Sequence, residues 1–93
     1  MIAARIAFSD RRQAHARARH LEDHKSYLRN APIRILQSGP FAGERPGALI
    51  VADVGSLDDL ESFNAGDPFV INGVYAEVHL VEWTITLADH INQ

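Results

Sequence analysis

The sequence predicts a single α+β domain over residues 1–93, with strands and helices in the order β-α-β-β-α-β. Three observations indicate this fold. The chain has 93 residues, 46% of them hydrophobic, which is enough for one small packed core. Four short segments carry the alternating or continuous apolar residues typical of strands. Two segments without Gly or Pro, residues 11–30 and 56–64, carry apolar residues at helical spacing.

The chain begins with a predicted strand and a long helix. Residues 1–8 alternate, and we expect one buried strand face made of every second residue: Ile2, Ala4, Ile6 and Phe8. Ser9-Asp10 then offers an N-cap, and Asp10 suits the positive end of a helix. Residues 11–30 are rich in Ala, Arg and Leu, which favour helix, and Asn30 and Pro32 end it.

Two strands are predicted in the middle of the chain. Ile33–Ser38 is a short strand, ended by Gly39-Pro40, and residues 41–46 form a polar turn. Residues 47–54 are almost continuously apolar, which favours a central strand covered on both faces.

A second helix, a short turn and a last strand complete the order. Ser56 followed by Asp59 resembles a capping box, and the helix ends by Gly66. Asp67-Pro68 opens a short turn or helix, because Asp suits an N-cap and Pro the first helical position. Tyr75–Leu87 is predicted to be one long strand, and the tail from Ala88 to Gln93 is expected to fray or to reach a partner.

This order predicts a ferredoxin-like fold, in which a four-stranded antiparallel sheet carries its helices on one face. The other face is also expected to be apolar, so it needs a cover. The chain has no cysteine, so disulfides cannot stabilise its small core. A second copy of the same sheet is the simplest cover, and we therefore expect a homodimer.

Charge is unevenly distributed along the chain. Residues 1–45 hold all nine basic residues and four acidic ones, a formal +5, whereas residues 46–93 hold eight acidic and no basic residues, a formal −8. This pattern allows a basic patch that attracts a small anion, or two solvated helix surfaces of opposite charge. A net charge of −3 without a basic run interleaved with aromatics argues against nucleic-acid binding. No apolar run could span a bilayer and no signal peptide is recognisable, so we expect a cytoplasmic protein without a membrane partner.

Four stretches in a fixed order resemble the YCII-related family. They are His24-Lys25-Ser26-Tyr27-Leu28, Ser38-Gly39-Pro40-Phe41, Gly47-Ala48-Leu49-Ile50-Val51, and Asp67-Pro68-Phe69-Val70 followed by Gly73-Val74-Tyr75. The closing Val81-Glu82-Trp83 also resembles the family, with Glu82 where proline is common. The resemblance covers nearly the whole chain. It implies the dimeric α+β barrel superfamily and a His–Asp pair, carried here onto His24 and Asp67.

The position of the family histidine has two possible alignments. Many relatives have an arginine three residues before it, where this chain has Leu21 before His24. Arg17 stands three residues before His20, which gives the alternative. His24 is preferred because Tyr27-Leu28 and the distance to Gly39 then fit.

Each candidate residue has a chemical and a structural interpretation. A partly buried His24 beside a carboxylate could act as a general base, with Asp67 orienting its ring. Asp67 could equally be only an N-cap. His20 and His24 are spaced i, i+4, a spacing that can bind a metal given further ligands, although surface histidines are the simpler interpretation and no metal is predicted.

The remaining candidates concern the substrate. Ser38, Gly39 and Pro40 could line the mouth of a pocket, or form a plain turn. Four aromatic residues could form its apolar walls or belong to the core: Tyr27, Phe41, Phe69 and Trp83.

We therefore predict a small enzyme without a cofactor. The reaction would be a proton abstraction that leads to elimination or isomerisation, of the lyase, isomerase or dehalogenase kind that the resemblance implies. The substrate would be a small anionic compound, and the resemblance implies one of the kind that aromatic-ring breakdown produces. The alternative is a non-catalytic homodimeric domain that binds a small molecule or serves a structural role, with His24 and Asp67 bonded to each other for stability.

Overall fold

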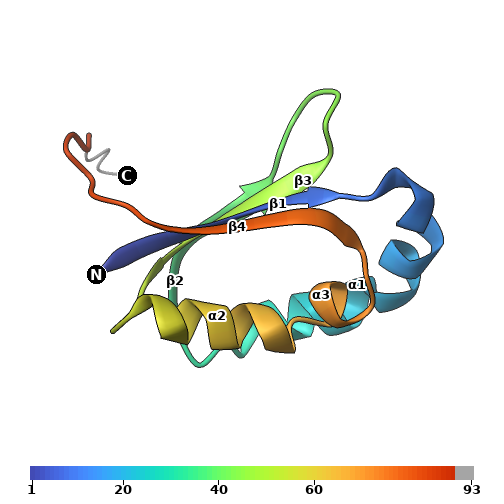
Figure 1. The fold of residues 1–93 in the computed structure, drawn as a ribbon, viewed down its shortest axis with the longest axis horizontal. Helices are drawn as coiled ribbons and strands as arrows, with labels where there is room; N and C mark the ends of the chain where they lie inside the picture. The colour runs from blue at the N-terminus through green and yellow to red at the C-terminus, as the bar shows by residue number, and fades with distance from the viewer. Residues whose placement is uncertain (90–93) are drawn as a thin grey trace.

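The computed structural model describes residues 1–89 and has the predicted order of strands and helices (Figure 1). The elements are β1 (Ile2–Ser9), the 3-10 turn η1 (Arg11–Gln13), α1 (Ala14–Arg29), β2 (Arg34–Pro40), β3 (Gly47–Asp53), α2 (Leu57–Gly66), α3 (Pro68–Ile71) and β4 (Tyr75–Glu82). The strands form one antiparallel sheet in the order β2-β3-β1-β4. Figure 1 shows α1, α2 and α3 together on one side of this sheet, so the predicted ferredoxin-like α+β fold is confirmed.

The helices cover the face of β1 opposite to the one predicted. Ala3, Arg5 and Ala7 point toward the helix layer and are almost fully buried, and Ala3 packs in one cluster with Leu60 and Phe63 of α2. The alternate residues therefore face the side of the sheet without helices, where Ala4 is buried as predicted but Ile2, Ile6 and Phe8 are only partly buried. Small alanine side chains let the helices approach the sheet closely, whereas the larger apolar residues are left on the open face.

Two strand ends differ from the prediction by two residues or more. β2 continues through Gly39 and Pro40, which pair with Leu49 and Ala48; a proline is tolerated there because β2 is an edge strand. β4 ends at Glu82 instead of Leu87. Its partner β1 begins at Ile2, whose carbonyl accepts one last bond from the Trp83 N–H at 2.9 Å, so the segment beyond has no strand to pair with.

The helix caps follow the predicted chemistry with one exception. Asp10 accepts a hydrogen bond from the Arg12 N–H, and Asp67 accepts one from the Phe69 N–H. Ser56 makes no side-chain capping bond. The Asp59 carboxylate instead accepts a hydrogen bond from the N–H of Gly55 at 3.2 Å. In a capping box this acidic side chain would bond the N–H of the N-cap residue, so here its bond goes to the residue one position earlier.

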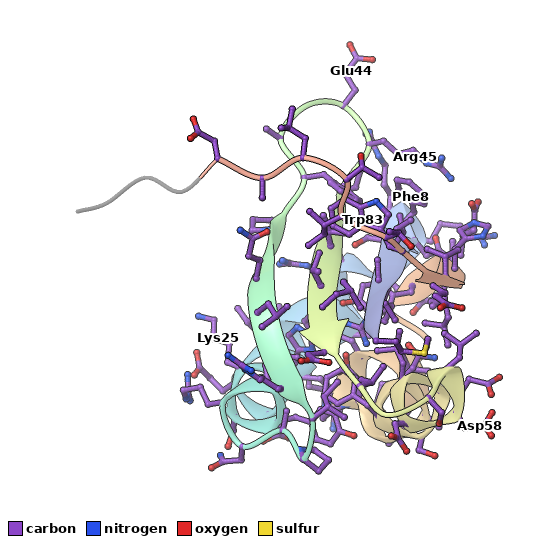
Figure 2. All side chains as sticks on the ribbon, turned by 90° about the vertical axis from the view of Figure 1, so that its left-hand side faces the viewer. Phe8, Lys25, Glu44, Arg45, Asp58 and Trp83 are labelled. Carbon is purple, nitrogen blue, oxygen red and sulfur yellow. The ribbon has the colours of Figure 1, made fainter. Side chains whose placement is uncertain are left out.

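The two sides of the sheet differ in character. Figure 2 shows Lys25 and Asp58 on the helix layer, whereas Phe8, Arg45 and Trp83 lie toward the other side of the sheet. There the Arg45 guanidinium lies 3.6 Å from the centre of the Phe8 ring, and Trp83 is 48% exposed. Within residues 1–89, no helix is long and apolar enough to cross a membrane.

Candidate active site

A histidine and an aspartate from distant parts of the chain meet between α1 and α3. His24 is the buried residue of α1, and its Nδ1 lies 2.7 Å from Oδ1 of Asp67. Asp67 is fully buried and occupies the N-cap of α3, where the same Oδ1 accepts the Phe69 N–H at 2.9 Å. The cap fixes the carboxylate, and the carboxylate then orients the imidazole. Capping and pairing with His24 are therefore simultaneous properties of one side chain.

Arg5 of β1 supports this pair from the sheet. Its Nη1 donates to Oδ2 of Asp67 at 2.7 Å and to Oδ1 of Asn64 at 3.3 Å, and its Nη2 donates to the Tyr75 hydroxyl at 3.4 Å. Arg5 is 1% exposed, so the ion pair with Asp67 lies entirely away from water. The guanidinium also stacks near the Phe63 and Tyr75 rings, with its carbon 5.7 and 5.3 Å from their centres.

These contacts keep Asp67 ionised. Burial raises the pKa of the Asp67 carboxyl, but hydrogen bonds from His24, the Phe69 N–H and Arg5 outweigh it, so the net pKa lies below the ordinary value. An ionised carboxylate can only accept hydrogen bonds, so Nδ1 of His24 is the donor. In neutral imidazole this leaves Nε2 without a proton, free to accept one.

Two aromatic rings complete the setting of His24. The Phe69 ring lies parallel to the imidazole, with centroids 3.9 Å apart and planes 3° apart, and it meets Tyr75 edge-on at 5.8 Å. Burial raises the pKa of the Tyr75 phenol, so its hydroxyl stays protonated at neutral pH and can donate a hydrogen bond.

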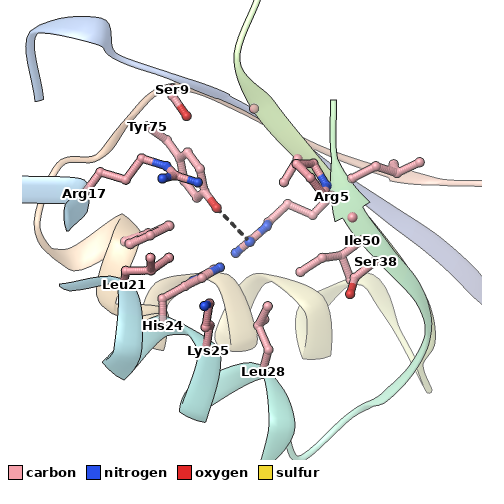
Figure 3. Close-up of a pocket in the computed structure, with 16 residues that line it drawn as sticks. Arg5, Ser9, Arg17, Leu21, His24, Lys25, Leu28, Ser38, Ile50 and Tyr75 are labelled. Atoms are coloured by element: carbon pink, nitrogen blue, oxygen red, sulfur yellow. Dashed lines mark hydrogen bonds between the residues drawn. The ribbon is translucent and has the colours of Figure 1, made fainter. Parts of the chain in front are cut away.

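A pocket of about 360 Å³ opens beside His24, within the usual size for a small-molecule site. Figure 3 shows that side chains of α1, β1 and β4 converge on it, with Arg5, His24 and Tyr75 around its centre. Every predicted substrate contact lines it: Ser38, Gly39, Pro40 and Phe69. Asp67 does not, because it lies behind His24.

An irregularity in β2 turns Ser38 toward this pocket. Ile35 pairs with Ala52 and Ser38 with Ile50, so the pairing register shifts by one residue between them. Ala52 and Ile50 both belong to the helix-facing side of β3. Residues three apart in a regular strand face opposite sides, so the shift is what brings Ser38 to the pocket side.

The other predicted candidates lie elsewhere. His20 does not line the pocket, and of the two alternative histidines only His24 contacts Asp67. Tyr27 belongs to the core, where its hydroxyl donates to the Phe63 carbonyl at 2.8 Å, and Phe41 stacks on Phe8. Trp83 is outside the pocket lining, so Phe69 is the one member of the predicted aromatic wall that borders it.

Arg5, Arg17 and Tyr75 also line the pocket, although sequence reasoning did not select them. Arg5 carried a usable signal, because it is the only charged residue in an otherwise apolar or small-residue strand. A charged residue at the centre of such a strand needs a buried partner. The histidines and carboxylates of residues 1–89 do not gather in threes at a place that could hold a metal.

Comparison with known proteins places the chain in context. The family model described as "YCII-related domain" matches residues 1–84. A solved structure similar to this chain is the 5-chloro-2-hydroxyhydroquinone dehydrochlorinase of Burkholderia phenoliruptrix AC1100 in complex with 2,5-dihydroxybenzoquinone. It has 22% identity and a TM-score of 0.82, and the alignment covers 90% of this chain and 94% of that one.

A second solved structure, of an Arabidopsis thaliana protein, has 12% identity and a TM-score of 0.53, covering 96% of this chain and 98% of that one. At these identities the two structures show a shared fold. No curated protein sequence matches the chain.

Proposed function

The chain belongs to the YCII-related family, and from this premise we propose that it is a small enzyme that needs no cofactor and uses His24 as a general base. The reaction is a proton abstraction that leads to elimination or isomerisation. One observation carries the proposal: a histidine whose Nδ1 is held by a buried, ionised aspartate stands in the wall of a pocket of substrate size.

The residues around the pocket can supply the base and the hydrogen-bond donor that such a reaction needs. Nε2 of His24 removes a proton from a carbon next to a carbonyl, and Asp67 stabilises the imidazolium that forms. The electron pair left on the substrate moves to the carbonyl oxygen, where the Tyr75 hydroxyl can donate a hydrogen bond. In an elimination, that pair returns to form a carbon–carbon double bond and expels a leaving group such as chloride from the adjacent carbon, while the proton remains on His24.

The solved relative suggests which compounds to test first. That protein is a dehydrochlorinase of a chlorinated hydroxyhydroquinone and was solved with 2,5-dihydroxybenzoquinone. Its ligand is a flat ring with two acidic hydroxyl groups, each conjugated to a carbonyl. A compound of this kind suits the pocket beside His24, because the compound is small, planar and negatively charged and the pocket is lined by basic side chains.

Chloride release from 5-chloro-2-hydroxyhydroquinone tests the elimination: in its keto tautomer, loss of a ring hydroxyl proton to His24 lets the oxygen electron pair move through the ring and expel chloride. Proton exchange in related ring-derived acids and lactones tests the abstraction from carbon. Turnover that depends on both His24 and Asp67 supports it. If 2,5-dihydroxybenzoquinone binds beside His24 and none of these compounds is converted, the domain is a small-molecule binder, which is the alternative function. Binding at a distance from His24 would contradict both.

We further propose that the protein works as a homodimer joined through the open face of the sheet. Ile6 lies at the centre of this face, paired with Leu49 on one side and His79 on the other. Around it lie Ile2 and Phe8, and the segment after β4 leaves Trp83, Ile85 and Leu87 between 44% and 91% exposed. A monomer rarely leaves so much apolar surface in water, and a second copy of the same sheet would cover it.

Replacing Ile6 with aspartate is expected to convert the dimer to a monomer, because a charge would be buried in the apolar contact. Sedimentation velocity at micromolar concentration measures this directly. Ile71→Asp is the matched control, since Ile71 is an apolar residue 65% exposed on α3, away from the open face. Wild type that sediments as a monomer, or equal effects of the two substitutions, would contradict the proposed interface.

A further inference from the structure

We propose that Arg17 binds an acidic group of the substrate at the mouth of the pocket, so that the protein acts on planar carboxylates or equally acidic ring oxyanions and discriminates against their neutral analogues. This inference rests on the proposed function of the His24 pocket. It adds the class of substrate and the residue that selects it.

The charged side chains that line the pocket are all basic. Arg5, Arg17 and Lys25 border the pocket together with His24, and none of the residues that line it is an Asp or Glu. The charge of Arg5 is balanced behind the wall by Asp67. No carboxylate of the lining offsets Arg17 and Lys25, so the mouth of the pocket is positively charged, which favours an anionic ligand.

Arg17 is better placed than Lys25 to hold that ligand. Lys25 already lies 3.7 Å from Glu22, whereas Arg17 forms no ion pair with any residue among positions 1–89. The Arg17 guanidinium carbon lies 5.7 Å from the centre of the Phe69 ring, the same ring that stacks on His24. A guanidinium can bind both oxygens of a carboxylate at once, which an ammonium group does not.

The position of Arg17 also suits the proposed reaction. Figure 3 shows its side chain reaching from α1 toward the Tyr75 hydroxyl, on the side of the pocket where His24 lies. Arg17, His24 and Tyr75 each lie near the Phe69 ring and line the same pocket, so a small planar ligand in this pocket would have all three within its surroundings. An acidic group held by Arg17 would fix the ring while His24 and Tyr75 act on another of its atoms.

The test compares benzoate with benzamide, which have nearly the same shape and differ in charge. Their affinities are measured by amide NMR titration for the wild type, Arg17→Gln and Arg19→Gln. Arg19 is the matched control, because it is exposed on the same helix and does not line the pocket. The Arg17→Gln variant is expected to bind benzoate about tenfold more weakly and benzamide equally well. Arg19→Gln should change either affinity less than about twofold.

Three outcomes would overturn the inference. The first is a wild type that binds benzoate no more tightly than benzamide. The second is an Arg17→Gln variant with unchanged benzoate affinity. The third is an equal loss of benzoate affinity in Arg17→Gln and Arg19→Gln, which would show that only the overall charge of the helix matters. The assay measures binding and needs no turnover. A loss of turnover in His24 variants and a loss of charge discrimination in Arg17 variants can therefore be observed independently.

Discussion

Replacing Arg5 with methionine is expected to lower the free energy of unfolding by about 3–5 kcal/mol, because the substitution leaves the carboxylate of Asp67 buried without its cation. Methionine keeps the apolar stem of the side chain but lacks the guanidinium, whose carbon lies near the Phe63 and Tyr75 rings. The loss of the charge that pairs with Asp67 is expected to be the largest part of the cost. Urea denaturation at pH 7, followed by circular dichroism, measures the loss.

Two further variants test whether this loss of stability is specific to the buried pair or would follow the removal of any ion pair. Arg12→Met removes the exposed pair with Asp10 and should leave stability unchanged within error. The double variant Arg5→Met with Asp67→Leu should recover part of the lost stability, since no charge then remains unpaired in the interior. The account is wrong if Arg5→Met costs no more than Arg12→Met, or if the double variant is less stable than both single variants.

The same pair should make stability depend on acid pH. The folded protein lowers the pKa of Asp67, so the unfolded chain binds more protons when the pH falls below the ordinary carboxyl value of about 3.9. The contribution of Asp67 is therefore complete above that value and is lost as the pH falls through its folded pKa. The double variant lacks this carboxylate and should lose less stability than the wild type in that acid range.

Replacing His24 with asparagine is expected to reduce the rate of substrate conversion by about 10²- to 10⁴-fold, the usual contribution of a general base. Asparagine can still bond to Asp67 but offers no nitrogen that accepts a proton near neutral pH. The rate is measured on whichever compound the wild type converts in the chloride-release and proton-exchange assays, at saturating concentration, so that kcat is read separately from KM.

His20→Asn is the control for this substitution. His20 is on the same helix, one turn away, and does not line the pocket, so its replacement should leave the rate unchanged. If the His24→Asn protein keeps its melting temperature and converts the substrate as fast as the wild type, His24 is not the general base. A lower melting temperature with an unchanged rate per folded molecule would favour the structural role of the pair.

The sequence predicted the fold well because its signals are local. The strand patterns, the Gly-free helix and the Asp67-Pro68 cap each act within a few residues. His24 and Asp67 are 43 positions apart in the sequence, and periodicity alone does not predict that they form a contact. The family resemblance suggested it, and the α3 cap shows why the carboxylate points there.

The rest of the site depends on tertiary structure that the sequence signals do not encode. The alternation in β1 shows that two faces differ, but not which one meets the helices. Choosing the larger apolar residues for the buried face placed Arg5 on the wrong side. Arg17 and Tyr75 come to the pocket only through the packing of α1 against α3 and the pairing of β4 with β1. β4 was predicted too long because its apolar pattern continues past the point where β1 begins.

In the proposed site, Asp67 fixes His24 so that Nε2 faces the pocket as a base. The most direct test is nitrogen NMR of the His24 side chain at alkaline pH, where histidines are neutral. The account predicts a proton on Nδ1 in the wild type and an Nε2 resonance that shifts when 2,5-dihydroxybenzoquinone is added. It also predicts that the preference for Nδ1–H weakens in Asp67→Asn. A proton on Nε2 in the wild type, or an Nε2 resonance unmoved by saturating ligand, would contradict it.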